Sequence, residues 1–113
     1  MSVIRDSRSD WLIISADDLK RGTAKSAELH AARGTHAARG VILDLGLLEY
    51  VDSSGLGVLF SIKKELEDRG KKLLLVNLQK AVATALQLVQ MEKVFPIYTD
   101  VDAALRADAR SNG

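Results

Sequence analysis

The stretch that decides the fold is Tyr50-Val51-Asp52-Ser53-Ser54-Gly55-Leu56-Gly57. The apolar run 41–45 precedes it, and residues 58–69 follow with leucines and charged side chains at helical spacing. A short apolar run bounded by turn residues is typical of a buried strand, and the second pattern is typical of an amphipathic helix. The stretch therefore predicts a strand-to-helix connection that delivers two hydroxyls and a carboxylate to the start of a helix.

The simplest interpretation of Asp52, Ser53 and Ser54 is a helix cap, because their oxygens accept hydrogen bonds from the unpaired N–H groups of a first helical turn. A cap uses one oxygen, however, and this loop offers three. Gly55 and Gly57 also cost the helix about 1 kcal/mol each relative to alanine. Since glycines let another molecule approach the hydroxyls and the backbone closely, the pattern predicts an accessible binding loop.

The rest of the chain alternates predicted strands and helices. We expect a hairpin from strands at 3–5 and 11–15, and later strands at 41–45, 73–76 and 94–98, the last at a sheet edge because of Pro96. Four helices are expected. The first covers 24–33, the second begins after the two serines and ends at 69, the third includes 82–89, and the fourth covers 101–105 and is capped by Asp100. This order predicts an α/β sandwich, with about four helices on a central sheet of four or five mainly parallel strands.

Helical spacing also predicts which side chains face the core. The expected core residues of the two middle helices are Leu56, Leu59, Phe60, Ile62, Leu66, Val82, Leu86 and Val89. Residues 1–105 are expected to form one domain. The polar residues 106–113 lack a core face and predict a flexible C-terminal tail.

Composition narrows the class of protein. The chain has 113 residues with 47% hydrophobic and 27% charged side chains, which is ordinary for a globular domain. A net charge of +1 argues against a nucleic-acid binder. The lack of cysteine excludes disulfides and thiolate metal sites, and no apolar run approaches the roughly 20 residues of a membrane-spanning helix. We expect a cytoplasmic protein that contacts no membrane and is a monomer when free.

Three chemistries are weaker interpretations of the same residues. The serines do not sit in the Gly-x-Ser-x-Gly elbow of hydrolases, and His30 and His36 are expected to lie at the surface rather than act as bases. These two histidines do not share a helix face as zinc pairs commonly do. Gly55-Leu56-Gly57 before a helix leaves a nucleotide-binding module open, although the phosphate-loop lysine is missing. We expect no catalytic residue, cofactor or metal ion.

The run 41–45 followed by residues 51–59 resembles the signature of the STAS domain, and is most similar to the bacterial anti-sigma factor antagonists of that family. The similarity extends from about Trp11 to Leu105 and implies the same fold. It implies a phosphoprotein of signal transduction and transcription regulation, in a partner-switching pathway. The unphosphorylated form would bind an anti-sigma factor that is a serine kinase, and phosphorylation of Ser54, or alternatively Ser53, would release it. A metal-dependent serine phosphatase would reverse the change.

The resemblance also implies partner-binding roles for Asp52, Ser53, Ser54, Gly55, Leu56 and Gly57. Phosphate at a helix N-terminus is tolerated by the helix dipole, so we expect the switch to act on binding and not on folding. Gly46 stands where the family commonly has serine or threonine, which predicts a softer loop after the strand. The alternative within the family is a non-phosphorylated STAS subunit of a lipid-transport complex or of a stressosome-like scaffold.

Overall fold

One mixed sheet forms the centre of the protein. The computed structural model describes residues 2–6, 11–15 and 39–112. The strands lie side by side in chain order: β1 (Ser2–Asp6), β2 (Trp11–Ser15), β3 (Gly40–Asp44), β4 (Lys72–Val76) and β5 (Ile97–Tyr98). β1 runs antiparallel to β2, and the other neighbouring pairs are parallel. The predicted hairpin and the mainly parallel sheet are confirmed.

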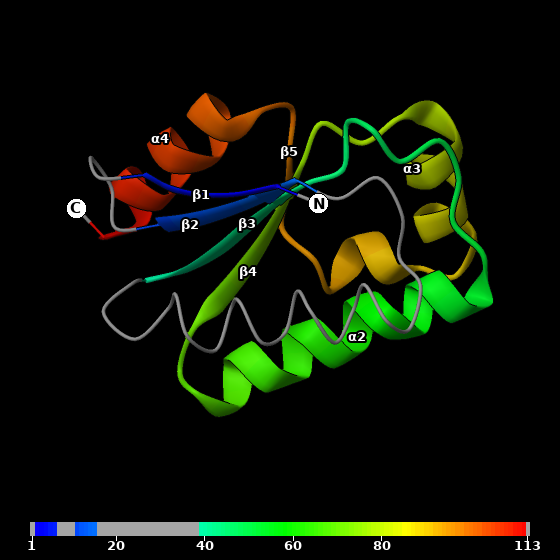
Figure 1. The fold of residues 1–113 in the computed structure, drawn as a ribbon, viewed down its shortest axis with the longest axis horizontal. Helices are drawn as coiled ribbons and strands as arrows, with labels where there is room; N and C mark the ends of the chain where they lie inside the picture. Colours follow the sequence, from blue (N-terminus) through cyan, green and yellow to red (C-terminus); the bar gives the residue numbers. More distant parts are fainter. Residues whose placement is uncertain (1, 7–10, 16–38, 113) are drawn as a thin grey trace.

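Helices cover both faces of this sheet. The described helices are α2 (Ser53–Asp68), α3 (Lys80–Leu88), the 3-10 helix η1 (Met91–Lys93) and α4 (Val101–Asn112). Figure 1 shows α2 crossing one face of the sheet while α4 lies on the other. The predicted helix at 24–33, which includes His30, and the later His36 lie outside the described residues. The α/β sandwich expected from the alternating pattern is confirmed.

The central strands are apolar on both sides because each side meets helices. Val41 and Leu43 of β3 belong to a core cluster with residues of α2 and α3, whereas Ile42 packs in a second cluster with Trp11 and with Ala104 of α4. β4 alternates in the same way. Strands covered on both faces read as nearly unbroken apolar runs, which is the pattern that the sequence shows.

Two side chains predicted to face the core do not. Phe60 is 46% exposed, because α2 buries Gly55, Leu59, Ile62 and Leu66 and the position after Leu59 is turned by about 100° away from that line. The Phe60 ring instead packs at the edge of the core, its centroid 5.8 Å from that of Phe95.

Val89 is the second correction, at 52% exposed. α3 ends at Leu88, and Gln90 adopts the left-handed backbone conformation with φ of 59°. The chain therefore turns into η1 before Val89 can reach the core, and Met91 and Phe95 are buried after the turn.

The C-terminal segments also differ from expectation. Only Ile97 and Tyr98 of the predicted strand at 94–98 pair with β4, and β5 lies at the sheet edge as Pro96 predicted. The last helix does not end near Leu105, since α4 continues to Asn112. Asp108, in the segment expected to lack a core face, is 7% exposed and its Oδ2 accepts a hydrogen bond from Arg39 at 2.8 Å. A buried carboxylate paired with arginine explains why this polar segment packs against the domain.

Candidate functional site

The start of α2 is capped by one residue. Asp52 has an extended backbone, and its Oδ1 accepts a hydrogen bond from the backbone N–H of Gly55 at 2.9 Å. Its carbonyl oxygen accepts the first helical bond, from the N–H of Leu56 at 3.0 Å. This is the geometry of an N-cap aspartate. The capping function that the sequence left open among three side chains therefore belongs to Asp52.

The two serines lie at the surface immediately after the cap. Ser53 and Ser54 are the first residues of α2, and both are exposed. Since Asp52 already accepts the hydrogen bond from Gly55, the cap does not require either hydroxyl. The arrangement presents two hydroxyls to solvent at the positive end of a sixteen-residue helix.

The structure separates the remaining predicted contact residues. Gly57 is exposed, and a Cβ added to it would meet nothing within 4 Å. Leu56 is half-buried against the core, and Gly55 is buried on the side of α2 that faces the sheet. Among the six predicted partner-binding residues, the exposed ones are Asp52, Ser53, Ser54 and Gly57.

The segment 45–54, here called the serine loop, is held at its beginning by hydrogen bonds. The N–H of Gly46 donates to Asp44 Oδ1 at 2.9 Å, and the Gly46 carbonyl accepts from Gln79 Nε2 at 2.7 Å. Leu48 is 4% exposed, and its N–H donates to the carbonyl of Leu45. The beginning of the serine loop thus has three hydrogen bonds around Gly46 and Leu48, and the softening expected from glycine at 46 stays a prediction.

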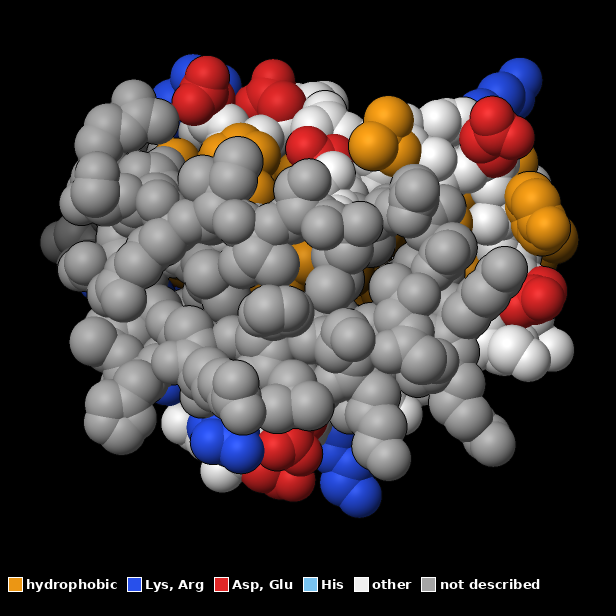
Figure 2. Space-filling model, in the orientation of Figure 1, with side chains coloured by type: hydrophobic (Ala, Val, Ile, Leu, Met, Phe, Trp, Pro, Cys, Tyr) orange, Lys and Arg blue, Asp and Glu red, His pale blue; other side chains and the backbone are white. Residues whose placement is uncertain are grey.

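Two apolar side chains extend the exposed surface of the serine loop. Leu47 is 66% exposed and Tyr50 is 72% exposed. Figure 2 shows hydrophobic side chains at the surface on the right-hand edge of the molecule, where Figure 1 places the serine loop and α3. Sequence reasoning missed both residues, because exposed and buried positions in an irregular loop follow no period. Both residues therefore add apolar surface to the same exposed segment that carries the serines.

A metal site and a membrane-spanning helix find no support in the described part of the chain. Across residues 2–6, 11–15 and 39–112, no three His, Cys, Asp or Glu side chains are grouped so that they could hold a metal ion. Within the same ranges, every helix is too short or too polar to cross a membrane.

Comparison with known proteins identifies the family. The STAS domain model matches residues 8–104, and the chain belongs to the STAS domain family. A Bordetella bronchiseptica protein named as a candidate anti-sigma factor antagonist, BtrV, is 35% identical over 81 residues, which cover 72% of this chain and 69% of the relative.

Solved structures show the same fold. A candidate anti-sigma factor antagonist of Thermotoga maritima has a TM-score of 0.79 at 21% identity, with 94% of this chain and 92% of that chain covered. The anti-sigma factor antagonist SpoIIAA in its unphosphorylated form has a TM-score of 0.71 at 18% identity, with 96% of each chain covered. The family predicted from the sequence is thus confirmed, and its relatives include proteins named as anti-sigma factor antagonists.

Proposed function

We propose that this protein is an anti-sigma factor antagonist that acts by partner switching. Its unphosphorylated form binds a serine-kinase anti-sigma factor through the serine loop, and phosphorylation of Ser54 ends that binding. The observation that carries the proposal is the exposed Ser54 hydroxyl at the start of a helix whose cap is already filled by Asp52. The relative named as a candidate anti-sigma factor antagonist supports the same function.

The physical effect of a phosphate at Ser54 would fall on the partner surface. The group carries about −1.5 to −2 charges at neutral pH. The helix dipole favours an anion near its N-terminus by about 0.3–1 kcal/mol, which opposes the repulsion from the Asp52 carboxylate. Because Ser54 is exposed, no packed side chain has to move. The fold is retained, whereas a partner docked on the serine loop meets a new charge that it must desolvate.

The surface around Ser54 is suited to a protein partner. Leu47 and Tyr50 supply exposed apolar area within the same serine loop, and the open space at Gly57 allows a partner backbone to come close. The kinase would use this surface for docking and Ser54 as its substrate, and a metal-dependent serine phosphatase would restore the binding form. The protein itself is a regulator in the cytoplasm and not an enzyme.

The test is an affinity capture from the native host with unmodified protein and with Ser54→Ala, Ser54→Asp and Ser53→Ala variants. Mass spectrometry would identify the captured partners and the phosphorylated peptide. We expect a kinase-related anti-sigma factor with every bait except Ser54→Asp, and phosphate in the unmodified and Ser53→Ala proteins.

Ser53→Ala is the matched control, because it removes the neighbouring exposed hydroxyl and keeps the acceptor. Phosphate that persists in Ser54→Ala and disappears in Ser53→Ala would move the acceptor to Ser53. If all four baits capture the same transport or scaffold subunits and carry no phosphate, the partner-switching proposal is wrong.

A further inference from the structure

Helix α4 alone among the described helices covers the side of the sheet that contains Trp11 (Figure 1). Its apolar contacts there are small. Between residues 101 and 108, Ala104 is the only fully buried apolar side chain of α4, and Val101 and Leu105 are half-buried. On the opposite side of the sheet, α2 buries two leucines and an isoleucine. Because the stabilisation scales with the apolar area buried, apolar packing holds α4 less firmly than α2.

The next position on the sheet-facing side of α4 holds a carboxylate. Asp108 lies four residues after Ala104, so both side chains project from the same face of the helix, and Asp108 is 7% exposed. Its Oδ2 accepts a hydrogen bond from Arg39 Nη1 at 2.8 Å, and its Oδ1 lies 3.5 Å from Lys72 Nζ. Burying a carboxylate is costly unless it is paired in this way. The second half of α4 is therefore held on the sheet mainly by ion pairs.

The two cations are accessible to solvent. Arg39 directly precedes β3, and Lys72 is the first residue of β4. Their side chains are 48% and 57% exposed, so each cation can be solvated by water when the carboxylate leaves. Dissolved ions also reach these exposed groups and screen their attraction to Asp108. The ion pairs can thus open without leaving a buried cation, and salt should weaken them.

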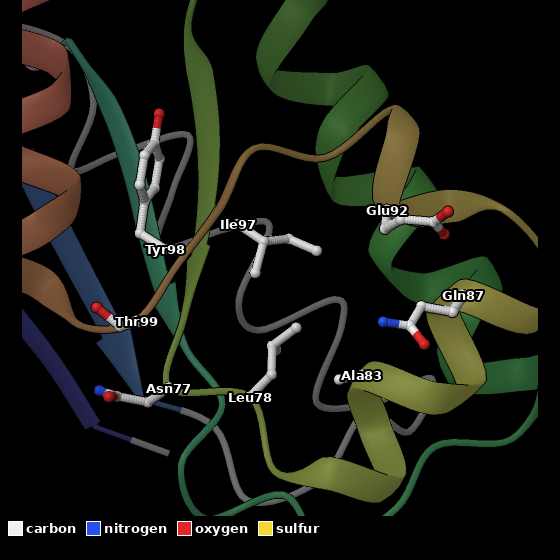
Figure 3. A pocket seen from close by; sticks show the side chains of 8 residues that line it. All are labelled: Asn77, Leu78, Ala83, Gln87, Glu92, Ile97, Tyr98 and Thr99. Carbon is white, nitrogen blue, oxygen red and sulfur yellow. The ribbon is translucent and has the colours of Figure 1, made fainter.

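The chain before α4 allows the helix to move as a unit. Asp100 Oδ1 accepts a hydrogen bond from the N–H of Ala103 at 2.8 Å, and this cap lies within the segment of the helix itself. The first turn can therefore persist when α4 leaves the sheet. Thr99 and Asp100 are exposed, whereas Ile97 and Tyr98 pack against the two different core clusters. Figure 3 shows these two side chains leaving β5 in different directions. The sheet is thus fixed up to Tyr98, and the hinge falls at residues 99–100.

We propose that α4 is a strap that opens and closes over this side of the sheet as one unit, and that the ion pairs of Asp108 with Arg39 and Lys72 are its latch. The structure shows the closed form. The open form exposes the apolar side of the sheet that contains Trp11 and Ile42, and a rising salt concentration increases its population. The proposal is independent of the function proposed above, since neither the serine loop nor a phosphate takes part in it.

The test is native-state amide hydrogen exchange of the full chain, followed by two-dimensional NMR, with α4 and α2 compared in the same sample. We expect the amides of 104–108 to exchange faster than those of 59–66. Raising the salt concentration from about 0.01 M to about 1 M shortens the screening length from about 30 Å to about 3 Å and should accelerate exchange about tenfold in α4 only. Asp108→Asn keeps the side-chain shape and removes the charge. It should speed α4 exchange at least about tenfold and abolish the salt dependence.

Arg106→Gln is the matched control, because it removes an exposed charge from α4 outside the latch and should change α4 exchange less than about twofold. Trp11, the single tryptophan of the chain, is fully buried and provides a second readout. Its quenching by acrylamide should increase in Asp108→Asn and stay unchanged in Arg106→Gln.

Three results would overturn the proposal. Equal acceleration of α2 and α4 in Asp108→Asn would show that the ion pairs stabilise the whole fold and not a separate strap. Exchange in α4 as slow as in α2 for all three proteins would show that α4 does not open by itself. Unchanged quenching of Trp11 in Asp108→Asn would show that the opening does not expose the sheet.

Discussion

Replacing Asp52 separates the two ways in which its side chain stabilises the start of α2, the capping hydrogen bond and the negative charge near the helix N-terminus. Asp52→Ala removes the oxygen that accepts the Gly55 N–H at 2.9 Å and leaves a donor of a buried residue without that partner. We expect the free energy of unfolding to fall by about 1 kcal/mol, the usual cost of losing an N-cap side chain. Asp52→Asn keeps an acceptor oxygen of the same reach. It loses only the attraction between the carboxylate and the helix dipole, about 0.5 kcal/mol.

Urea unfolding followed by far-ultraviolet circular dichroism measures both changes, provided that the dependence on urea concentration is the same for the three proteins. The alanine variant should also melt about 4 °C below the unmodified protein. An alanine variant as stable as the unmodified protein would refute the capping geometry. An asparagine variant as unstable as the alanine variant would show that charge, not hydrogen bonding, carries the effect.

Three further variants test other parts of the structure. Gly40→Ala should cost at least about 2 kcal/mol in urea unfolding or prevent folding, because its Cβ would lie 2.2 Å from the backbone oxygen of Lys72. Gly57→Ala, whose Cβ meets no atom, is its control and should not destabilise the protein. Gln79→Ala should speed amide hydrogen exchange in the serine loop, since the hydrogen bond from Gln79 to the Gly46 carbonyl is lost. Unchanged exchange would show that this hydrogen bond does not hold the loop. Tyr50→Ser, at a 72% exposed position, should leave stability within about 0.5 kcal/mol and weaken anti-sigma factor capture severalfold; unchanged capture would remove Tyr50 from the interface.

The sheet and the start of α2 could be predicted because their signals are local. The apolar residues 41–43 and 73–76 belong to strands buried on both faces, so every side chain in these runs is in the same apolar environment. Asp52 precedes a helical pattern, and its carboxylate lies only three residues before Gly55, whose N–H donates the capping hydrogen bond. The sequence contains both partners of that contact within one turn, which is why the cap was among the expected interpretations.

The errors lie where the outcome depends on contacts between distant segments. Asp108 is buried because Arg39 reaches it from 69 residues away, and polar residues near a chain end give no sign of such a partner. Phe60 directly follows the buried Leu59, so its side chain leaves the core-facing side of α2 and its ring packs against Phe95 instead. A pocket lined by Leu78, Ala83 and Ile97, among others, is likewise built from α3 and from segments on either side of it, so no short motif could have indicated it.

In the serine loop, one side chain caps the helix and others are exposed, so the same stretch could both direct the fold and act as the proposed switch. A helix start that depended on a serine hydroxyl for its cap would lose that hydrogen bond when the hydroxyl was modified. Here the cap belongs to Asp52, and the adjacent serines are exposed. A change of charge at Ser54 would therefore leave the first turn of α2 intact, and its energetic cost would fall on whatever protein is docked there. This separation is the physical reason for expecting the modified and unmodified forms to differ in binding rather than in stability.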